Sequence, residues 1–167
     1  MSATDLVVTP GGLRFGGRLW PCTIGRGGIT ARKREGDGCT PAGRHRIVGM
    51  LYRPDRIART ALPDWAVPIR PFDLWCDDPD HEHYNQMVAA PFPASAERLR
   101  RADPMYDLVL VTDWNWPEAQ PGRGSAIFLH IWRRPGHPTA GCVALARADL
   151  IGIARRLRPD SRLVVRA

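Results

Sequence analysis

Apolar residues recur along the chain in short runs, which turns rich in Gly or Pro separate from one another. This pattern is typical of many short β-strands rather than of long helices. The clearest predicted central strands cover residues 106–112 (YDLVLVT) and 125–132 (SAIFLHIW). Shorter strands are predicted at residues 142–145 and 163–165. The fold class that the pattern predicts is therefore mainly β.

The first half of the chain predicts further strands and turns. Gly16 and Gly17 separate two short extended segments, which is a hairpin signal. A loop at residues 33–43 (KREGDGCTPAG) leads into a predicted strand at residues 44–50 (RHRIVGM). Residues 51–75 contain four prolines and are expected to be irregular.

One or two short helices are expected beside the strands. Residues 94–102 (ASAERLRRA) predict a helix of about two turns, with Ser95 as its N-cap. Residues 148–157 predict an amphipathic helix, because their aliphatic side chains recur at a spacing that places them on one face. Pro159 ends this second helix, since a proline cannot continue it.

The length of 167 residues is that of one domain, expected to span residues 1–167. No apolar run reaches the roughly 18 residues of a transmembrane helix. The first residues, MSATDLVVTPGG, lack the basic and apolar regions of a secretory leader. We therefore expect no membrane span, and no signal peptide is visible. The sequence leaves the oligomeric state unknown, and a monomer is the expectation.

The chain is basic, with a formal net charge of +7, and Lys33 is its only lysine among 24 basic residues. The arginines are not gathered in one block, and no pattern of a known DNA- or RNA-binding motif is present. Arginine presents a planar fork that suits carboxylates as well as phosphates. An anionic small or polymeric ligand rich in carboxylates is at least as well supported as nucleic acid. The expected partner is therefore such a ligand and not nucleic acid, while a basic nucleic-acid binder stays open as a further interpretation.

A candidate for chemistry lies where two predicted strands end and begin. His130 ends one apolar run, and Cys142 follows Gly141 at the head of the next. A thiol nucleophile needs a base that removes its proton and backbone N–H groups that stabilise an oxyanion. The pattern predicts neighbouring strands that carry His130 and Cys142 to the same rim, with an Arg-rich loop between them.

A metal site is an alternative reading of the polar segment at residues 75–88. Its ligand-type side chains are those of Cys76, Asp77, Asp78, Asp80, His81 and His83. Their spacing matches no standard structural zinc pattern, so neither a metal nor another cofactor is expected. The four cysteines have no CxxC spacing, and they are expected to be free thiols, with one disulfide among Cys22, Cys39 and Cys76 left open.

The segment around Cys142 resembles the catalytic signature of the L,D-transpeptidase catalytic domain (YkuD-type) family. That signature is a histidine, a loop, Ser or Thr, any residue, Gly, Cys and a small apolar strand. Here His130, Thr139, Gly141, Cys142 and Val143 follow it in order.

Two upstream blocks agree with this resemblance. The family has a G…TP-x-G block about a hundred residues before the cysteine. The matching residues are Gly38, Thr40, Pro41 and Gly43. A looser block, Tyr84-Asn85, resembles a tyrosine-asparagine stretch of small family members. The resemblance covers nearly the whole chain.

The resemblance implies a single-domain, β-sandwich-like fold and an acyl-enzyme on cysteine. Cys142 would be the nucleophile and His130 the base. The backbone carbonyl of Ile131 would orient the imidazole, the N–H groups of Gly141 and Cys142 would form the oxyanion hole, and Thr139 would shape the site.

The resemblance also implies peptidoglycan stem peptides as the substrate and a place in the periplasm or cell envelope. Arg133 and Arg134 of the loop have an electrostatic reason to bind the carboxylates of such peptides. Tyr84 and Asn85 are further candidates for substrate binding. The resulting prediction is an L,D-transpeptidase that forms cross-links of the 3-3 or the 1-3 type.

Departures from the family pattern lie at and beside the loop that separates the base from the nucleophile. Many members have Gly where this chain has Ile131, His where it has Ala140, and Arg where it has Ala144. These positions bear on the choice of donor and acceptor. An L,D-carboxypeptidase that trims stem peptides and a non-catalytic peptidoglycan-binding relative therefore stay open as alternatives.

Overall fold

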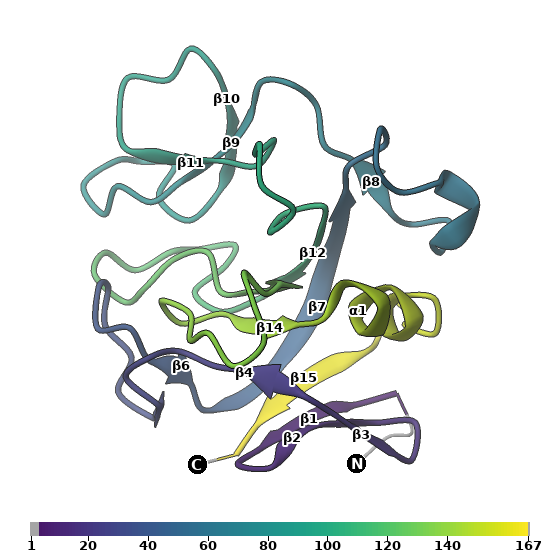
Figure 1. Ribbon diagram of the computed structural model, residues 1–167. Coiled ribbons are helices and arrows are strands. Elements are labelled where there is room, and N and C mark those ends of the chain that lie inside the picture. The colour runs from purple at the N-terminus through teal and green to yellow at the C-terminus, as the bar shows by residue number, and fades with distance from the viewer. Residues whose placement is uncertain (1–3, 167) are drawn as a thin grey trace.

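The computed structural model of the chain describes residues 4–166, and most strands of this part join one large sheet (Figure 1). Its ten strands are β1 (Leu6–Thr9), β2 (Gly12–Phe15), β3 (Arg18–Trp20), β4 (Cys22–Thr23), β7 (Gly43–Tyr52), β8 (Val67–Pro68), β12 (Leu108–Thr112), β13 (Phe128–Ile131), β14 (Val143–Leu145) and β15 (Arg162–Val165). Their order is β3-β2-β1-β15-β7-β12-β13-β14-β4, with β8 paired to β7. The sheet curls until β2 contacts β4, so that it approaches a barrel.

Two small sheets and two short helices complete the elements of the described residues. β5 (Ile29–Thr30) pairs with β6 (Thr40–Pro41), and β9 (Asp73–Cys76) lies between β10 (Met87–Ala89) and β11 (Ala96–Arg98). The helices are the 3₁₀-helix η1 (Arg59–Ala61) and the α-helix α1 (Arg147–Ala154). Figure 1 shows the three-stranded sheet at the top and α1 beside the large sheet. The predicted mainly β, sandwich-like fold is confirmed.

The predicted hairpin is present between β2 and β3. Gly16 and Gly17, at its turn, have φ angles of 58° and 77°. Two consecutive positive φ angles are those of a type I′ turn, which glycine adopts without strain and which matches the twist of a hairpin. β1 also pairs in parallel with β15, so the first and last strands lie side by side.

Strand β12 is apolar at successive positions because both of its faces are covered. Leu108 and Leu110 belong to the main core, whereas Val109 and Val111 belong to a second apolar cluster on the opposite face. A strand that is buried on both sides has an unbroken apolar run instead of an alternating one. Cys142 packs against the second cluster, which therefore supports the site described below.

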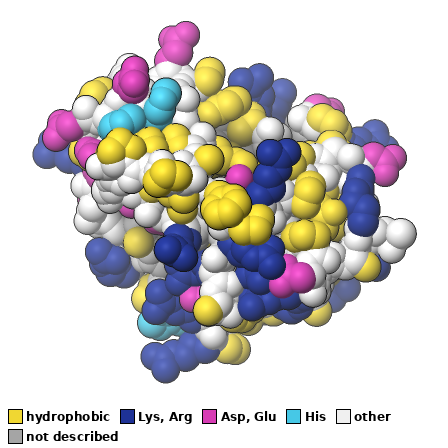
Figure 2. All heavy atoms as spheres, turned by 90° about the horizontal axis from the view of Figure 1, so that it is seen from above, with side chains coloured by type: hydrophobic (Ala, Val, Ile, Leu, Met, Phe, Trp, Pro, Cys, Tyr) yellow, Lys and Arg dark blue, Asp and Glu magenta, His cyan; other side chains and the backbone are white. Residues whose placement is uncertain are grey.

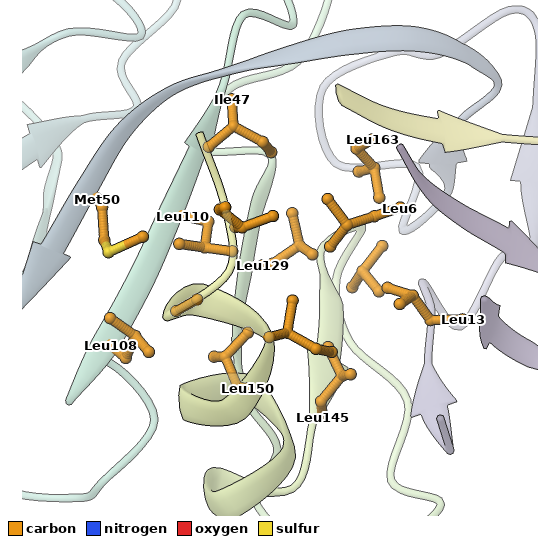
Figure 3. Packing of buried hydrophobic residues seen from close by; sticks show 14 of the residues in the cluster. Leu6, Leu13, Ile47, Met50, Leu108, Leu110, Leu129, Leu145, Leu150 and Leu163 are labelled. Atoms are coloured by element: carbon orange, nitrogen blue, oxygen red, sulfur yellow. The ribbon is translucent and has the colours of Figure 1, made fainter. Parts of the chain in front are cut away.

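Helix α1 covers the main core through Leu150, Ile153 and Ala154, all fully buried. In Figure 3, Leu150 points from the helix toward Leu129 of β13 and Leu145 of β14. Burial of an aliphatic side chain contributes roughly 1.5–3 kcal/mol. This packing holds the two strands that carry the candidate site. The helix predicted at residues 148–157 is thus confirmed, with its bounds shifted slightly toward the N-terminus.

The helix predicted at residues 94–102 is wrong, because this segment forms strand β11 and pairs with β9. The segment has one large aliphatic side chain, Leu99, so it offers no apolar helix face that tertiary packing could bury. Ser95 does not cap a helix, since its hydroxyl donates a 2.6 Å hydrogen bond to Asp77 Oδ1.

Residues 51–75 are less irregular than expected. β7 continues to Tyr52, and η1, β8 and the start of β9 follow it. The thiols of all four cysteines are free in the structure. Among the described residues, no helix combines the length and the apolar character needed to cross a membrane.

Candidate active site

Strands β13 and β14 bring His130 and Cys142 to the same cleft. The two strands are parallel neighbours, and His130 is in register with Ala144, two residues after the cysteine. The cleft has a volume of about 580 Å³, and both His130 and Cys142 line it. The prediction that neighbouring strands bring His130 and Cys142 together is therefore confirmed.

The Cys142 thiol is held by two backbone groups of the segment that leads into β13. Its S–H donates to the Ala126 carbonyl oxygen at 3.1 Å, and its sulfur accepts from the Phe128 N–H at 3.4 Å. Burial raises the pKa of the thiol to about 12. The thiol is therefore neutral in the free protein, and it would act as a nucleophile only if a base removed its proton.

The His130 imidazole is buried and oriented by its own strand. Nδ1 lies 2.8 Å from the carbonyl oxygen of Ile131. A carbonyl oxygen only accepts, so Nδ1 carries the proton and Nε2 keeps its lone pair. Burial lowers the pKa of His130, which keeps the imidazole neutral. The Tyr106 ring packs edge-on against it, with ring centroids 5.4 Å apart.

A tight turn precedes Cys142. Thr139 Oγ1 donates to the Cys142 carbonyl oxygen at 2.6 Å and accepts the Gly141 N–H at 3.1 Å. Gly141 has a φ of 145°, and a Cβ atom there would lie 2.9 Å from the Cys39 carbonyl oxygen. Only glycine fits this position. The Gly141 N–H, expected in the oxyanion hole, is thus already bonded to Thr139 in this structure.

The TP-x-G block supports the same turn from the other side. Thr40 is fully buried, and its hydroxyl donates to the Gly141 carbonyl oxygen at 2.8 Å. The hydroxyl also accepts the Gly25 N–H at 2.9 Å. The two sequence blocks, a hundred residues apart, therefore meet in one buried hydrogen-bond chain.

Tyr84 and Asn85 lie outside the lining of the cleft. Asn85 is buried, and its Oδ1 accepts the N–H groups of Ala126, at 2.9 Å, and of the Trp75 indole, at 3.0 Å. Its amide nitrogen donates to the carbonyl oxygens of Trp114 and Asn115. These four bonds occupy both donor and both acceptor positions of the amide, so no position is left to bind a substrate. Asn85 instead fixes Ala126, whose φ is 51° and whose carbonyl accepts the Cys142 thiol.

Tyr84 supports the loop before β13 in a similar way. Its hydroxyl donates to Glu35 and accepts the Gly124 N–H at 3.1 Å. The Ser125 hydroxyl donates to the same Glu35 carboxylate at 2.9 Å. Burial, followed by the neighbouring carboxylate, raises the pKa of Tyr84 above its usual range. Its neutral hydroxyl therefore serves as a structural donor.

The walls of the cleft carry charges of both signs. The basic side chains are those of Arg26, Lys33, Arg101 and Arg133, and the acidic ones are those of Glu35, Asp77 and Glu97. Arg133 therefore lines the cleft as the sequence suggested, whereas Arg134 does not belong to its lining. Basic side chains are spread over the face in Figure 2 and are interrupted by apolar and acidic ones.

Sequence reasoning missed several side chains of the cleft, above all Glu97, Arg101 and Tyr106. Glu97 and Arg101 fall in the segment that was expected to be a helix, and Tyr106 was assigned only to a strand. The sole sequence signal is the alternation of small and polar residues in ASAER, which also fits a strand.

The polar segment around Cys76 gives no support to the metal alternative. Within the part of the chain that the structure describes, no three His, Cys, Asp or Glu side chains are arranged to hold a metal ion. The rings of His81 and His83 lie 5.4 Å apart, and His81 also packs against Phe92.

A thiol and a neutral imidazole that share a cleft on neighbouring strands form a site suited to cysteine acyl transfer. A family model described as the L,D-transpeptidase catalytic domain, YkuD, matches residues 4–165. The chain therefore belongs to the L,D-transpeptidase catalytic domain family. Searches of curated proteins and of solved structures return no match. Members of this family are cysteine-dependent, act on peptidoglycan stem peptides and are typically extracytoplasmic.

Proposed function

We propose that the protein is a peptidoglycan L,D-transpeptidase in which Cys142 forms an acyl-enzyme with a donor stem peptide. The observation that carries this proposal is the shared cleft of Cys142 and His130, with Nδ1 of His130 bonded to the Ile131 carbonyl oxygen at 2.8 Å. This bond leaves Nε2 as the basic atom.

In the first half-reaction, the thiol of Cys142 gives its proton to Nε2 of His130 as the sulfur attacks the donor amide. The amide is the L-to-D bond after the third residue of the stem. Since burial raises the pKa of the thiol and lowers that of the imidazole, a stable ion pair does not form beforehand. Proton transfer is therefore coupled to the attack, and the imidazolium then protonates the leaving amine.

The oxyanion of the tetrahedral intermediate needs donors beside the nucleophile. The N–H of Cys142 is one such donor. The N–H of Gly141 becomes the second when it exchanges its bond to Thr139 Oγ1 for a bond to the oxyanion. Thr139 then keeps the turn in place through its 2.6 Å bond to the Cys142 carbonyl oxygen.

In the second half-reaction, an acceptor amine resolves the thioester and gives a 3-3 or 1-3 cross-link. Stem peptides carry several carboxylates, and the guanidinium groups of Arg26, Arg101 and Arg133 lie in the cleft to bind them. Water as the acceptor would give an L,D-carboxypeptidase from the same acyl-enzyme.

Incubation with purified muropeptides, followed by mass spectrometry, tests the proposal, with Cys142→Ala as the inactive control. Cross-linked dimers are the expected product of the wild-type protein. Trimmed tripeptides alone would make it a carboxypeptidase, and no product at all would make it a non-catalytic relative.

The family resemblance supports a place in the periplasm or cell envelope, where the proposed substrate lies. Cell fractionation of the native protein tests this part of the proposal. Recovery in the envelope fraction is expected, and recovery in the cytosol alone would contradict it.

A further inference from the structure

Glu97 is a carboxylate that the acyl-transfer chemistry above does not use. It projects from β11 into the cleft that contains Cys142 and His130. Its Oε2 accepts a 2.7 Å hydrogen bond from the Tyr106 hydroxyl. The Tyr106 ring in turn packs edge-on against His130. Tyr106 therefore contacts Glu97 through its hydroxyl and His130 through its ring.

The carboxylate of Glu97 forms no salt bridge with any described residue, and the charge of the nearby Arg101 guanidinium attracts it only from a distance. Among the described residues, the Tyr106 hydroxyl is its only hydrogen-bond donor, and no ion pair engages it. Glu35, by comparison, accepts two hydroxyls, those of Tyr84 and Ser125. Glu97 is half-buried, and a carboxylate in such a place with one neutral donor has capacity for a further, cationic donor.

The charge of Glu97 acts against the first half-reaction. It raises the pKa of the Cys142 thiol, in addition to the larger effect of burial, and so makes the thiolate harder to form. In the second half-reaction this disadvantage disappears, because the sulfur is then part of a thioester. The incoming group is an amine, which is a cation near neutral pH and is attracted by a carboxylate.

We propose that Glu97 binds the ammonium group of the acceptor stem peptide and so directs the acyl-enzyme toward cross-linking instead of hydrolysis. This inference rests on the L,D-transpeptidase function proposed above. Water is neutral and gains no ionic attraction from Glu97, so the carboxylate favours the amine over water as the acceptor.

The step balances in protons and bonds. The bound ammonium gives one proton to Nε2 of His130, and the resulting amine attacks the thioester carbon. As the C–N bond forms and the C–S bond breaks, the imidazolium protonates the leaving sulfur of Cys142. The second proton that the nitrogen loses passes to the Glu97 carboxylate and from there to solvent. Burial raises the pKa of Glu97, which suits it to accept that proton for a short time.

The test compares the wild-type protein with Glu97→Gln, which keeps the shape and removes the charge. A tetrapeptide muropeptide is the donor, a tripeptide muropeptide is the added acceptor, and dimers and trimmed tripeptides are quantified by mass spectrometry. We expect the ratio of dimer to hydrolysis product to fall about tenfold, the factor that one charge-assisted hydrogen bond is worth. The acceptor concentration for half-maximal cross-linking rises accordingly.

A second measurement separates acceptor binding from a structural role of Glu97. The rate at which a carbapenem acylates Cys142 is expected to increase in Glu97→Gln, since the thiol pKa falls when the charge is removed. A purely structural role would slow this step together with cross-linking, and that result would overturn the inference. Tyr106→Phe, which removes the single donor to Glu97 and keeps the ring, should lower the product ratio by a smaller factor.

Glu118→Gln is the matched control, because Glu118 is exposed and lies outside the lining of the cleft. It should leave the product ratio unchanged. A wild-type protein that cross-links and a Glu97→Gln variant with the same product ratio would contradict the acceptor role alone. A wild-type protein with neither an adduct nor a product would instead contradict the proposed function.

Discussion

The buried Thr40 hydroxyl joins the TP-x-G block to the turn before Cys142. Its removal should lower both the stability of the protein and the reactivity of the site. In Thr40→Val the shape is kept, but the Gly141 carbonyl oxygen loses its 2.8 Å donor and the Gly25 N–H loses its 2.9 Å acceptor. Each buried polar group that is left without a partner costs about 1–3 kcal/mol. With two such groups, the variant should therefore be less stable by about 2–6 kcal/mol.

Urea denaturation measures this loss of stability, and acylation of Cys142 by a carbapenem measures its effect on the site. Thr40→Ser is the control, because it keeps the hydroxyl and removes one methyl group, at a cost of about 1 kcal/mol. If Thr40→Val matched the wild-type free energy of unfolding within about 0.5 kcal/mol, the hydrogen-bond chain would not support the turn.

Three further predictions follow from the site and the core. Burial lowers the pKa of His130, and only the neutral imidazole accepts a proton. The acylation rate should therefore rise with pH through an apparent pKa below 6.5. A pH profile with its midpoint above 7 would contradict this. Asn85→Ala should lower stability by about 2–4 kcal/mol and slow acylation, because Ala126 loses its anchor; denaturation and adduct formation measure both. Leu150→Ala should cost about 2–5 kcal/mol in the same denaturation assay, whereas a cost below 1 kcal/mol would place Leu150 outside the core.

The sequence pattern was sufficient to predict those elements whose secondary structure follows from which side chains are buried. The run LVLV around Leu110 and the apolar face of residues 148–157 identify a buried strand and a covering helix, because burial alone decides both. The pair of His130 and Cys142 was also predictable. His130 lies near the end of one apolar run and Cys142 at the start of the next, and the register of the two parallel strands places His130 beside Ala144, two residues after the cysteine.

The segment at residues 94–102 shows where local pattern fails. Its Ala, Glu and Arg residues favour a helix in isolation, yet the backbone pairs with β9, where Ala96 lies opposite Cys76 and Arg98 opposite Leu74. Such pairing depends on a partner that local propensity does not reveal. The charges that Glu97 and Arg101 bring to the cleft were missed for the same reason.

The structural role of Asn85 could not be predicted from the sequence, for a different reason. A tyrosine-asparagine pair beside polar residues suggests a binding surface, whereas the structure buries the amide among four backbone and indole partners. The side-chain amide of Asn85 makes hydrogen bonds to backbone groups of the irregular segments around Ala126. Only the tertiary contacts distinguish that use from contact with a substrate.

The central claim, that Cys142 carries the acyl group, is tested most directly by trapping the intermediate. The protein is mixed with a tetrapeptide muropeptide, quenched in acid and measured by intact mass spectrometry, with Cys142→Ala as the control. We predict a mass increase equal to the donor acyl group, mapped to the peptide that contains Cys142 and absent from the variant. An unmodified wild-type mass while products accumulate, or an adduct on Cys39, would contradict the account.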